Sequence, residues 1–147
     1  MIEGTYALSY CYKSGHFGAS EATQRKANDL LNIAISADHL RAGLGIVYNS
    51  AEIDIESPFV QRFSKIARTL TTHKDARRNW LGAEFLFRII DAGVSHPDEV
   101  DPSIRVGFEN SAKKGYAPAI EMMGFLDGAW HDPSKNKTAV VHWIRAL

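Results

Sequence analysis

Apolar residues recur along this chain at spacings of three and four, which is the period of an amphipathic helix. No segment alternates apolar and polar residues over the length of a strand, so the sequence predicts an all-α fold. Turn-forming residues group the predicted helices into about four hairpins. The helices expected in these hairpins span residues 3–14 and 21–35, 38–50 and 57–71, 75–92 and 102–114, and 117–128 and 134–146.

The predicted helix ends carry local signals. Ser20 is typical of a helix N-cap, and Ser57 followed by Pro58 gives an N-cap with proline at the first helical position. Gly15 is expected to end the first helix in a left-handed backbone conformation, which residues with a Cβ adopt at a cost. The stretch GVSHPDEVDPS, residues 93–103, is expected to be a loop because of its prolines and acidic residues.

Small residues separated by seven positions recur in the second helix of each hairpin. The pairs are Ala27 and Ala34, Val60 and Ala67, Arg105 and Ala112, and Ala139 and Ala146, two of them imperfect. The second members are 33, 45 and 34 residues apart, which indicates a repeating unit of about 35 residues with one insertion. Since two helices cross closely only where one side chain is small, these residues are expected to form interhelical contacts.

Three segments carry a resemblance to a known family. They are AKKGYAPA (residues 112–119) with Met123-Gly124, Leu44-Gly45 with Tyr48, and residues 139–146 with Trp143. This pattern is similar to Sel-one-like repeats, which are relatives of the tetratricopeptide repeat. The resemblance implies a single domain over residues 1–147, folded as a right-handed α-solenoid in which each hairpin contacts mainly its neighbours. It also implies a concave wall that binds a peptide or another protein's surface.

The resemblance assigns particular positions to this wall. They are Tyr6, Tyr10, Lys13, His39, Ile46, Asn49, Glu84, Arg88, Asp91, Glu121 and Phe125. Aromatic side chains and arginine dominate the energies of protein interfaces, so this set suits a protein partner. For each position the alternative stays open that the tyrosines belong to the core and that the charges are merely solvated.

The last predicted helix is apolar on two sides. Ala139, Trp143 and Ala146 lie on one side, and Val140, Ile144 and Leu147 lie on the other. Solenoids normally end in a polar cap, so the second side is expected to form a homodimer or to dock a partner.

Composition narrows the partner and the location. The chain has 147 residues, of which 45% are hydrophobic and 23% charged, as in an ordinary globular domain. Basic and acidic residues balance at 17 each, so nucleic acid is not an expected partner. Cys11, the single cysteine, is expected to be a buried thiol in a reducing compartment. We expect a cytoplasmic protein without a membrane segment, because no signal-like or long apolar stretch occurs.

Candidate catalytic chemistry is sparse. The six histidines include no helical His-Glu metal pair, and the sequence has no nucleophile elbow, phosphate loop or dinucleotide glycine pattern. The acidic run after His96, which contains Asp98, Glu99 and Asp101, lacks the spacing of a calcium loop and is interpreted as a solvated insertion. His131 and Asp132 form the other His-carboxylate grouping, in a predicted loop. We therefore expect no catalytic residue, metal or cofactor.

The expected function is a non-catalytic, cytoplasmic protein-binding module. Proteins similar to this pattern include bacterial scaffolds and regulators, and the resemblance implies that a short example can be an immunity protein that neutralises a toxin. The alternative is a structural subunit that self-associates through its C-terminal helix. An enzyme is the third reading, which stoichiometric zinc or calcium in the purified protein would favour.

Overall fold

The structure is a computed structural model that describes residues 2–49, 53–90, 97–129, 141 and 144–145. All regular secondary structure among these residues is helical, which confirms the predicted all-α fold class. The chain forms two compact units, Met1–Ala51 and Glu52–Leu147, whereas the sequence predicted one domain. The boundary between the units falls between the two helices of the predicted second hairpin.

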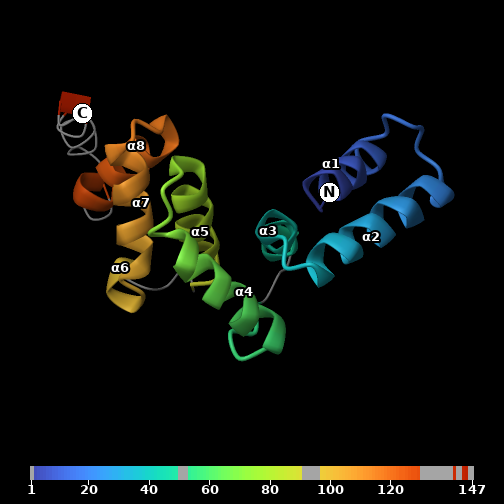
Figure 1. Cartoon of the computed structure of the whole chain (residues 1–147), viewed down its shortest axis with the longest axis horizontal. Coiled ribbons are helices and arrows are strands. Elements are labelled where there is room, and N and C mark those ends of the chain that lie inside the picture. Colours follow the sequence, from blue (N-terminus) through green and yellow to red (C-terminus); the bar gives the residue numbers. More distant parts are fainter. Residues whose placement is uncertain (1, 50–52, 91–96, 130–140, 142–143, 146–147) are drawn as a thin grey trace. The chain divides into compact units, whose positions relative to one another are not determined.

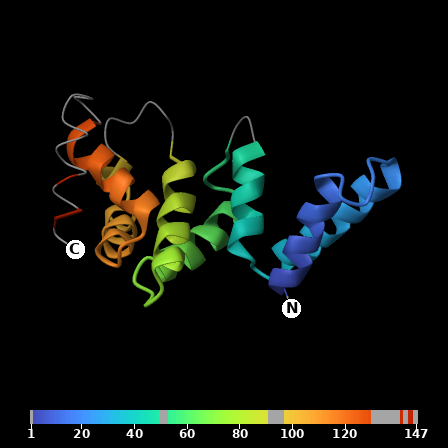
Figure 2. The same ribbon diagram turned by 90° about the horizontal axis from the view of Figure 1, so that it is seen from above.

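The first unit is a hairpin of two helices followed by a shorter third helix (Figure 2). Its elements are α1 (Ile2–Lys13), α2 (Glu21–Ser36) and α3 (Leu40–Asn49). Helix α1 packs along α2, and α2 also contacts α3. The buried residues of α1 and α2 are all small, namely Ser9, Ala27 and Ala34. The predicted small pair of this hairpin therefore does lie in a packed position, and the two helices meet through small side chains.

The second unit is a layer of helices in which α5 lies between α4 and α7 (Figure 1). Its elements are α4 (Pro58–Leu70), α5 (Ala76–Arg88), α6 (Pro97–Val100), α7 (Ser103–Lys113), α8 (Ala117–Gly124) and the π-helical segment η1 (Phe125–Ala129). Phe63, Phe85 and Phe108 come from α4, α5 and α7, and all three are fully buried. They form the aromatic centre of the core. Trp80 is half-buried and packs against Phe108 and Tyr116, as its predicted core role requires.

The predicted helix starts are confirmed at Ser20 and Ser57. The Ser20 hydroxyl accepts the Thr23 backbone N–H at 3.2 Å, and the Ser57 hydroxyl accepts the Val60 N–H at 3.2 Å. Three of the helices end in a left-handed residue, Gly15 after α1, Asp38 after α2 and Gly115 after α7. Gly15 was predicted in this role, whereas Asp38 shows that the same backbone turn also forms without glycine.

Several predicted boundaries differ from the structure. The predicted helix 75–92 ends as α5 at Arg88, where β-branched Ile89 and Ile90 follow. The predicted loop 93–103 contains the short helix α6, because Pro97 suits a first helical position and Asp98 and Glu99 favour a first turn. The predicted helix 117–128 is α8 continued by η1. In the predicted helix 134–146, the described residues 141, 144 and 145 are helical, and the rest lie outside the described residues, Ala139 and Ala146 included.

Two glycines allow the closest approaches between helices of the second unit. A Cβ built on Gly82 of α5 would collide with the Ala67 carbonyl oxygen of α4. A Cβ on Gly107 of α7 would lie 2.7 Å from the Ala83 Cβ of α5, far inside contact distance. Ala67 belongs to a predicted small pair, but the sequence analysis did not single out either glycine. The tightest contacts therefore pair a glycine with an alanine on the facing helix.

A buried amide joins the turn between α4 and α5 to both helices. Asn79 is fully buried, and its Nδ2 donates to the carbonyl oxygens of Leu70 at 3.0 Å, Thr71 at 3.1 Å and His73 at 2.7 Å. Lys114, just beyond α7, donates from Nζ to the Asn79 Oδ1 at 2.6 Å. These bonds satisfy carbonyls that the end of α4 leaves without helical partners. A single side chain thus fixes the path of the chain between two core helices.

The Asp75 carboxylate caps α5, and its charge predicts a pH effect. Its Oδ1 accepts the Arg78 backbone N–H at 3.0 Å, and this bond is the main cause that holds the pKa of the Asp75 carboxyl below its ordinary value of 3.8. A depressed pKa stabilises the fold above the ordinary value, and that stability is lost as the pH falls through the folded-state pKa. We expect Asp75→Asn, which keeps a capping oxygen, to be less stable than wild type at pH 7 and equally stable in strong acid.

Circular dichroism melting across acidic to neutral pH checks this expectation. Asp75→Ala, which has no capping oxygen, should be less stable than wild type at every pH. A gap between wild type and Asp75→Asn that stays constant down to strong acid would show that the carboxylate charge contributes nothing.

Candidate functional site

The first unit places large aromatic side chains on its surface. Tyr10 of α1 is 63% exposed, and Phe17, in the turn that follows, is 56% exposed and packs on Tyr12. The cause is local, because Ser9 and the two alanines of α2 occupy the packed positions of this hairpin. Lys13 is also exposed, close to the end of α1. Tyr10, Lys13 and Phe17, which we call the aromatic surface, combine apolar contact area with a positive charge.

Two predicted wall residues, Tyr6 and His39, are brought together by the fold. Their rings stack with centroids 4.9 Å apart. His39 Nδ1 accepts the Ala42 backbone N–H at 3.3 Å and so caps α3, while Nε2 lies 3.0 Å from the Glu3 carboxylate. An Nδ1 that accepts a hydrogen bond carries no proton, so Nε2 donates to Glu3. Both ring nitrogens are therefore engaged in holding α1 against the start of α3, and Tyr6 is half-buried in the same contact.

The other predicted residues of the first unit contribute less surface. Ile46 is half-buried on α3, and Asn49 is the last residue of that helix. Cys11 was expected to be buried and is half-buried. The accessible part of the predicted wall in this unit is therefore Tyr10 and Lys13.

In the second unit, Glu84 differs from the prediction of an open position. It is only 4% exposed, and its Oε1 accepts the Arg88 Nε at 3.0 Å, one helical turn along α5. The reason is the central place of α5, which is flanked by helices on two sides and leaves few of its positions on the surface. Glu84 is thus a buried acid that holds Arg88, and Arg88 itself is exposed. Asp91 lies outside the described residues.

The remaining predicted positions lie near the end of the described chain. Glu121 on α8 and Phe125 at the start of η1 are both exposed, four residues apart. In the predicted C-terminal patch, Ile144 is 53% exposed, and Val140 and Leu147 lie outside the described residues. His131 and Asp132 lie outside them as well.

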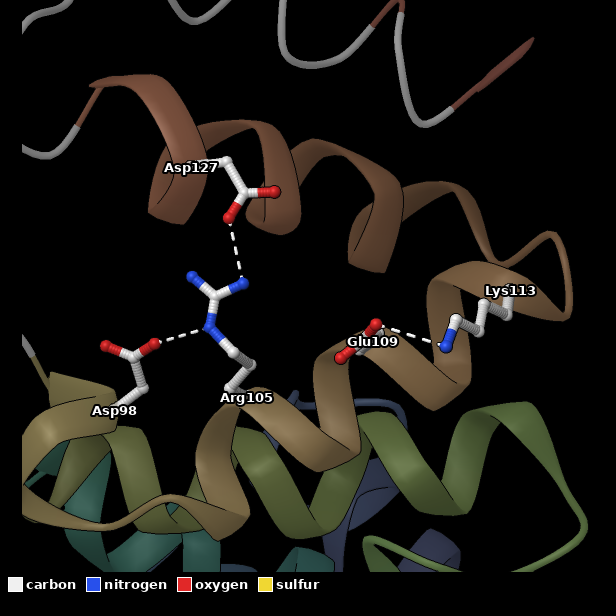
Figure 3. Close-up of polar contacts among 5 residues, drawn as sticks. All are labelled: Asp98, Arg105, Glu109, Lys113 and Asp127. Atoms are coloured by element: carbon white, nitrogen blue, oxygen red, sulfur yellow. Dashed lines mark hydrogen bonds and ion pairs between the residues drawn. The ribbon is translucent and has the colours of Figure 1, made fainter. Parts of the chain in front are cut away.

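A three-residue ion-pair cluster on α7 was not predicted (Figure 3). Arg105 Nε donates to the Asp98 Oδ2 of α6 at 2.6 Å, and Nη1 donates to the Asp127 Oδ1 of η1 at 2.8 Å. Burial lowers the pKa of Arg105, but the hydrogen bonds to the two carboxylates outweigh burial and raise that pKa above its ordinary value. Arg105 therefore stays charged and ties α6 and η1 to the same turn of α7.

The same geometry corrects the interpretation of the acidic run as a solvated insertion. The Asp98 side chain is nearly buried, and Asp101 pairs with Arg68 of α4 at 3.1 Å. Glu99 is exposed, as predicted. The arginines at positions 68 and 105 are the only sequence signal for these pairs, and their separation from the acids by up to 33 positions hides it.

Replacing Arg105 should destabilise the second unit. Arg105→Met leaves the nearly buried Asp98 without its partner, and we expect a loss of about 1–2 kcal/mol after allowing for the partial exposure of Arg105. Arg105→Lys should lose nearly as much, because one ammonium cannot reproduce the two-pronged guanidinium geometry. Urea denaturation measures both losses, and Lys113→Met, which removes the more exposed pair with Glu109, is the control with little change. Equal effects from all three variants would mean that burial of the pair is unimportant.

Other kinds of site find no support within the described part of the chain. No group of three or more His, Cys, Asp or Glu residues there is arranged to hold a metal ion. Among the described helices, none has the length and apolar character needed to cross a membrane. The features that sequence reasoning missed, namely Asn79, Arg105 and the exposure of Phe17, all depend on neighbours distant in the sequence or on which face a helix buries. Comparison of the chain with protein-family models, with curated proteins and with solved structures finds no match.

Proposed function

We propose that this protein is a non-catalytic protein-binding module built from helical hairpins that stack as a right-handed α-solenoid of about four Sel-one-like units. The serial packing of helices supports this proposal. Within the first unit α1 contacts α2 and α2 contacts α3, and within the second unit α4, α5, α7 and α8 contact one another in chain order. Packing against sequence neighbours is the arrangement that a repeat protein requires.

The observation that carries the functional proposal is the aromatic surface of the first unit. Its hairpin packs through Ser9, Ala27 and Ala34, while Tyr10 and Phe17 remain exposed. Exposed tyrosine and phenylalanine beside a cation are the side chains that anchor protein interfaces. Tyr10 is therefore a better anchor than Glu84, which is buried.

The role that we propose for this module is to occlude or bridge another protein, as an immunity protein does when it neutralises a bacterial toxin. The resemblance to Sel-one-like repeats supports this role, and so does the combination of exposed aromatic residues with balanced charge, which suits a protein partner better than nucleic acid.

Affinity purification from the native host tests the proposal. Wild type should retain a stoichiometric partner, Tyr10→Ala should lose it by about tenfold or more in affinity, and both should melt alike because Tyr10 is outside the core. Ile33→Ala, a truncation of an exposed apolar residue on α2, is the matched control and should keep the partner. Retention of the partner by Tyr10→Ala would exclude the aromatic surface. Arg88→Glu is a poorer probe, because it also places a second acid beside buried Glu84.

A second candidate function is assembly through the C-terminal helix, which the exposure of Ile144 favours. Sedimentation of wild type should then show self-association, and Val140→Glu/Ile144→Glu should be monomeric. A wild-type monomer at all concentrations would contradict this function.

A further inference from the structure

The zero net charge of the chain conceals a strong separation of charge. Residues 62–78 contain six of the 17 Lys and Arg residues and one of the 17 acids, which leaves 11 basic and 16 acidic residues elsewhere. The six are Arg62, Lys65, Arg68, Lys74, Arg77 and Arg78, and the acid is Asp75. One part of the second unit is therefore locally cationic within a neutral protein.

The fold adds two more cations to the end of this segment. The turn between α4 and α5 meets the C-terminal end of α7, where Lys114 Nζ donates to the His73 carbonyl oxygen at 2.9 Å and Ser111 Oγ donates to the Ala76 carbonyl oxygen at 2.7 Å. Arg78 Nη1 lies 3.3 Å from the His73 ring. Lys74, Arg77, Arg78, Lys113 and Lys114 are all exposed, and we call these five residues the basic corner.

Much of this charge is not neutralised internally. Among the described residues, neither the Lys74 ammonium nor the Arg77 guanidinium forms an ion pair, whereas Lys113 pairs with Glu109. The one acid within the turn, Asp75, is occupied in capping α5. Its pKa is depressed first by the Arg78 backbone N–H, and the positive charges of Arg78 and His73 contribute further. The capping carboxylate thus senses the positive potential of its surroundings.

We propose that the basic corner binds an acidic segment of a protein partner. Guanidinium groups can bind carboxylates through two parallel hydrogen bonds, and lysines add attraction without demanding a geometry. This inference rests on the proposed protein-binding function and adds the charge of the partner and a second surface, distinct from the aromatic surface. A short acidic segment fits better than nucleic acid, because the excess of acids over the rest of the chain repels an extended polyanion.

Fluorescence anisotropy with a labelled oligoglutamate peptide tests the basic corner in the full chain. A protein without net charge should bind this peptide only through a local patch, and binding should weaken as NaCl rises from about 0.05 to about 0.5 M, because salt screens the attraction. Lys74→Glu/Arg77→Glu should weaken binding by about tenfold or more. Arg25→Glu/Lys26→Glu, two exposed residues of α2, changes the net charge equally and should have little effect.

The remaining arms separate the alternatives. Lys74→Gln/Arg77→Gln should also weaken binding with unchanged helicity, which rules out misfolding as the cause. Tyr10→Ala should bind oligoglutamate normally, so loss of the native partner in that variant and failure of the basic corner are distinguishable results. The proposal is overturned by absence of oligoglutamate binding, by equal weakening in the α2 control, or by tighter binding to a single-stranded oligonucleotide of equal charge.

Discussion

Asn79→Ala should lower the free energy of unfolding of the second unit by about 3 kcal/mol or more, the largest effect that we expect from a polar substitution. The amide of Asn79 serves three backbone carbonyls and one ammonium, and none of these partners has an evident substitute when the amide is removed. The carbonyls of Leu70 and Thr71 would be left desolvated at the end of α4. For a unit of this size the loss corresponds to a fall of about 10 °C or more in Tm.

Two further substitutions separate the hydrogen bonds of Asn79 from its volume. Asn79→Asp conserves shape but turns a carboxylate oxygen toward the same carbonyls, so we expect it to be as destabilising as alanine. Asn110→Ala removes a single bond to the Thr71 carbonyl, 2.9 Å long, from a half-buried residue and should lose about 1 kcal/mol. Thermal and urea denaturation measure all three variants. A tolerated Asn79→Asp would mean that volume matters here and the hydrogen bonds do not.

Gly82→Ala should destabilise the protein although alanine is the better helix former. In an exposed helix interior this replacement stabilises by about 1 kcal/mol. At Gly82 the new methyl group meets the Ala67 backbone and lies 3.1 Å from the Leu70 Cβ, so α4 and α5 must separate. Overpacking of this kind typically destabilises by about 1–3 kcal/mol, which reverses the sign. Gly107→Ala should behave in the same way, because its Cβ would lie 2.9 Å from the Asn79 carbonyl oxygen.

Gly45→Ala provides the contrast for both variants. Gly45 lies within α3, and a Cβ there would have nothing within 4 Å, so the intrinsic helix preference should dominate and stabilise the first unit. Melting curves of the three variants distinguish the two situations by sign. If Gly82→Ala and Gly107→Ala also raised Tm, the close crossing of α5 with α4 and α7 would be incorrect.

The local features of the fold could be predicted because their causes are local. Ser20 and Ser57 cap α2 and α4 through backbone groups three residues away, and Gly15 ends α1 through a backbone angle that glycine adopts freely. Helix α6 was missed because its single turn gives too short a period to recognise, although Pro97 and the acids after it are start signals. Boundaries at Arg88 and Gly124 shifted because helix ends depend on packing as well as propensity.

The candidate site was predicted less well. The resemblance placed Tyr10 and Lys13 on a binding surface, and both are exposed, but exposure alone does not test whether they bind a partner. It also placed Glu84 there, and the structure buries that residue beside Arg88. Periodicity cannot tell how many faces of a helix will be covered, and α5 has neighbours on two sides.

By itself, the sequence determined the helical class of this protein, the capped starts of α2 and α4, and the small residues of α2, because apolar period and capping chemistry act within a few residues of one another. Only the tertiary structure decided that Asn79 is buried, that Lys114 meets it from 35 positions away, and that Arg105 joins Asp98 to Asp127. The physical reason is that a polar group buried by folding must find partners on whichever segments the packed helices bring to it, and that choice is made by the shape of the whole unit.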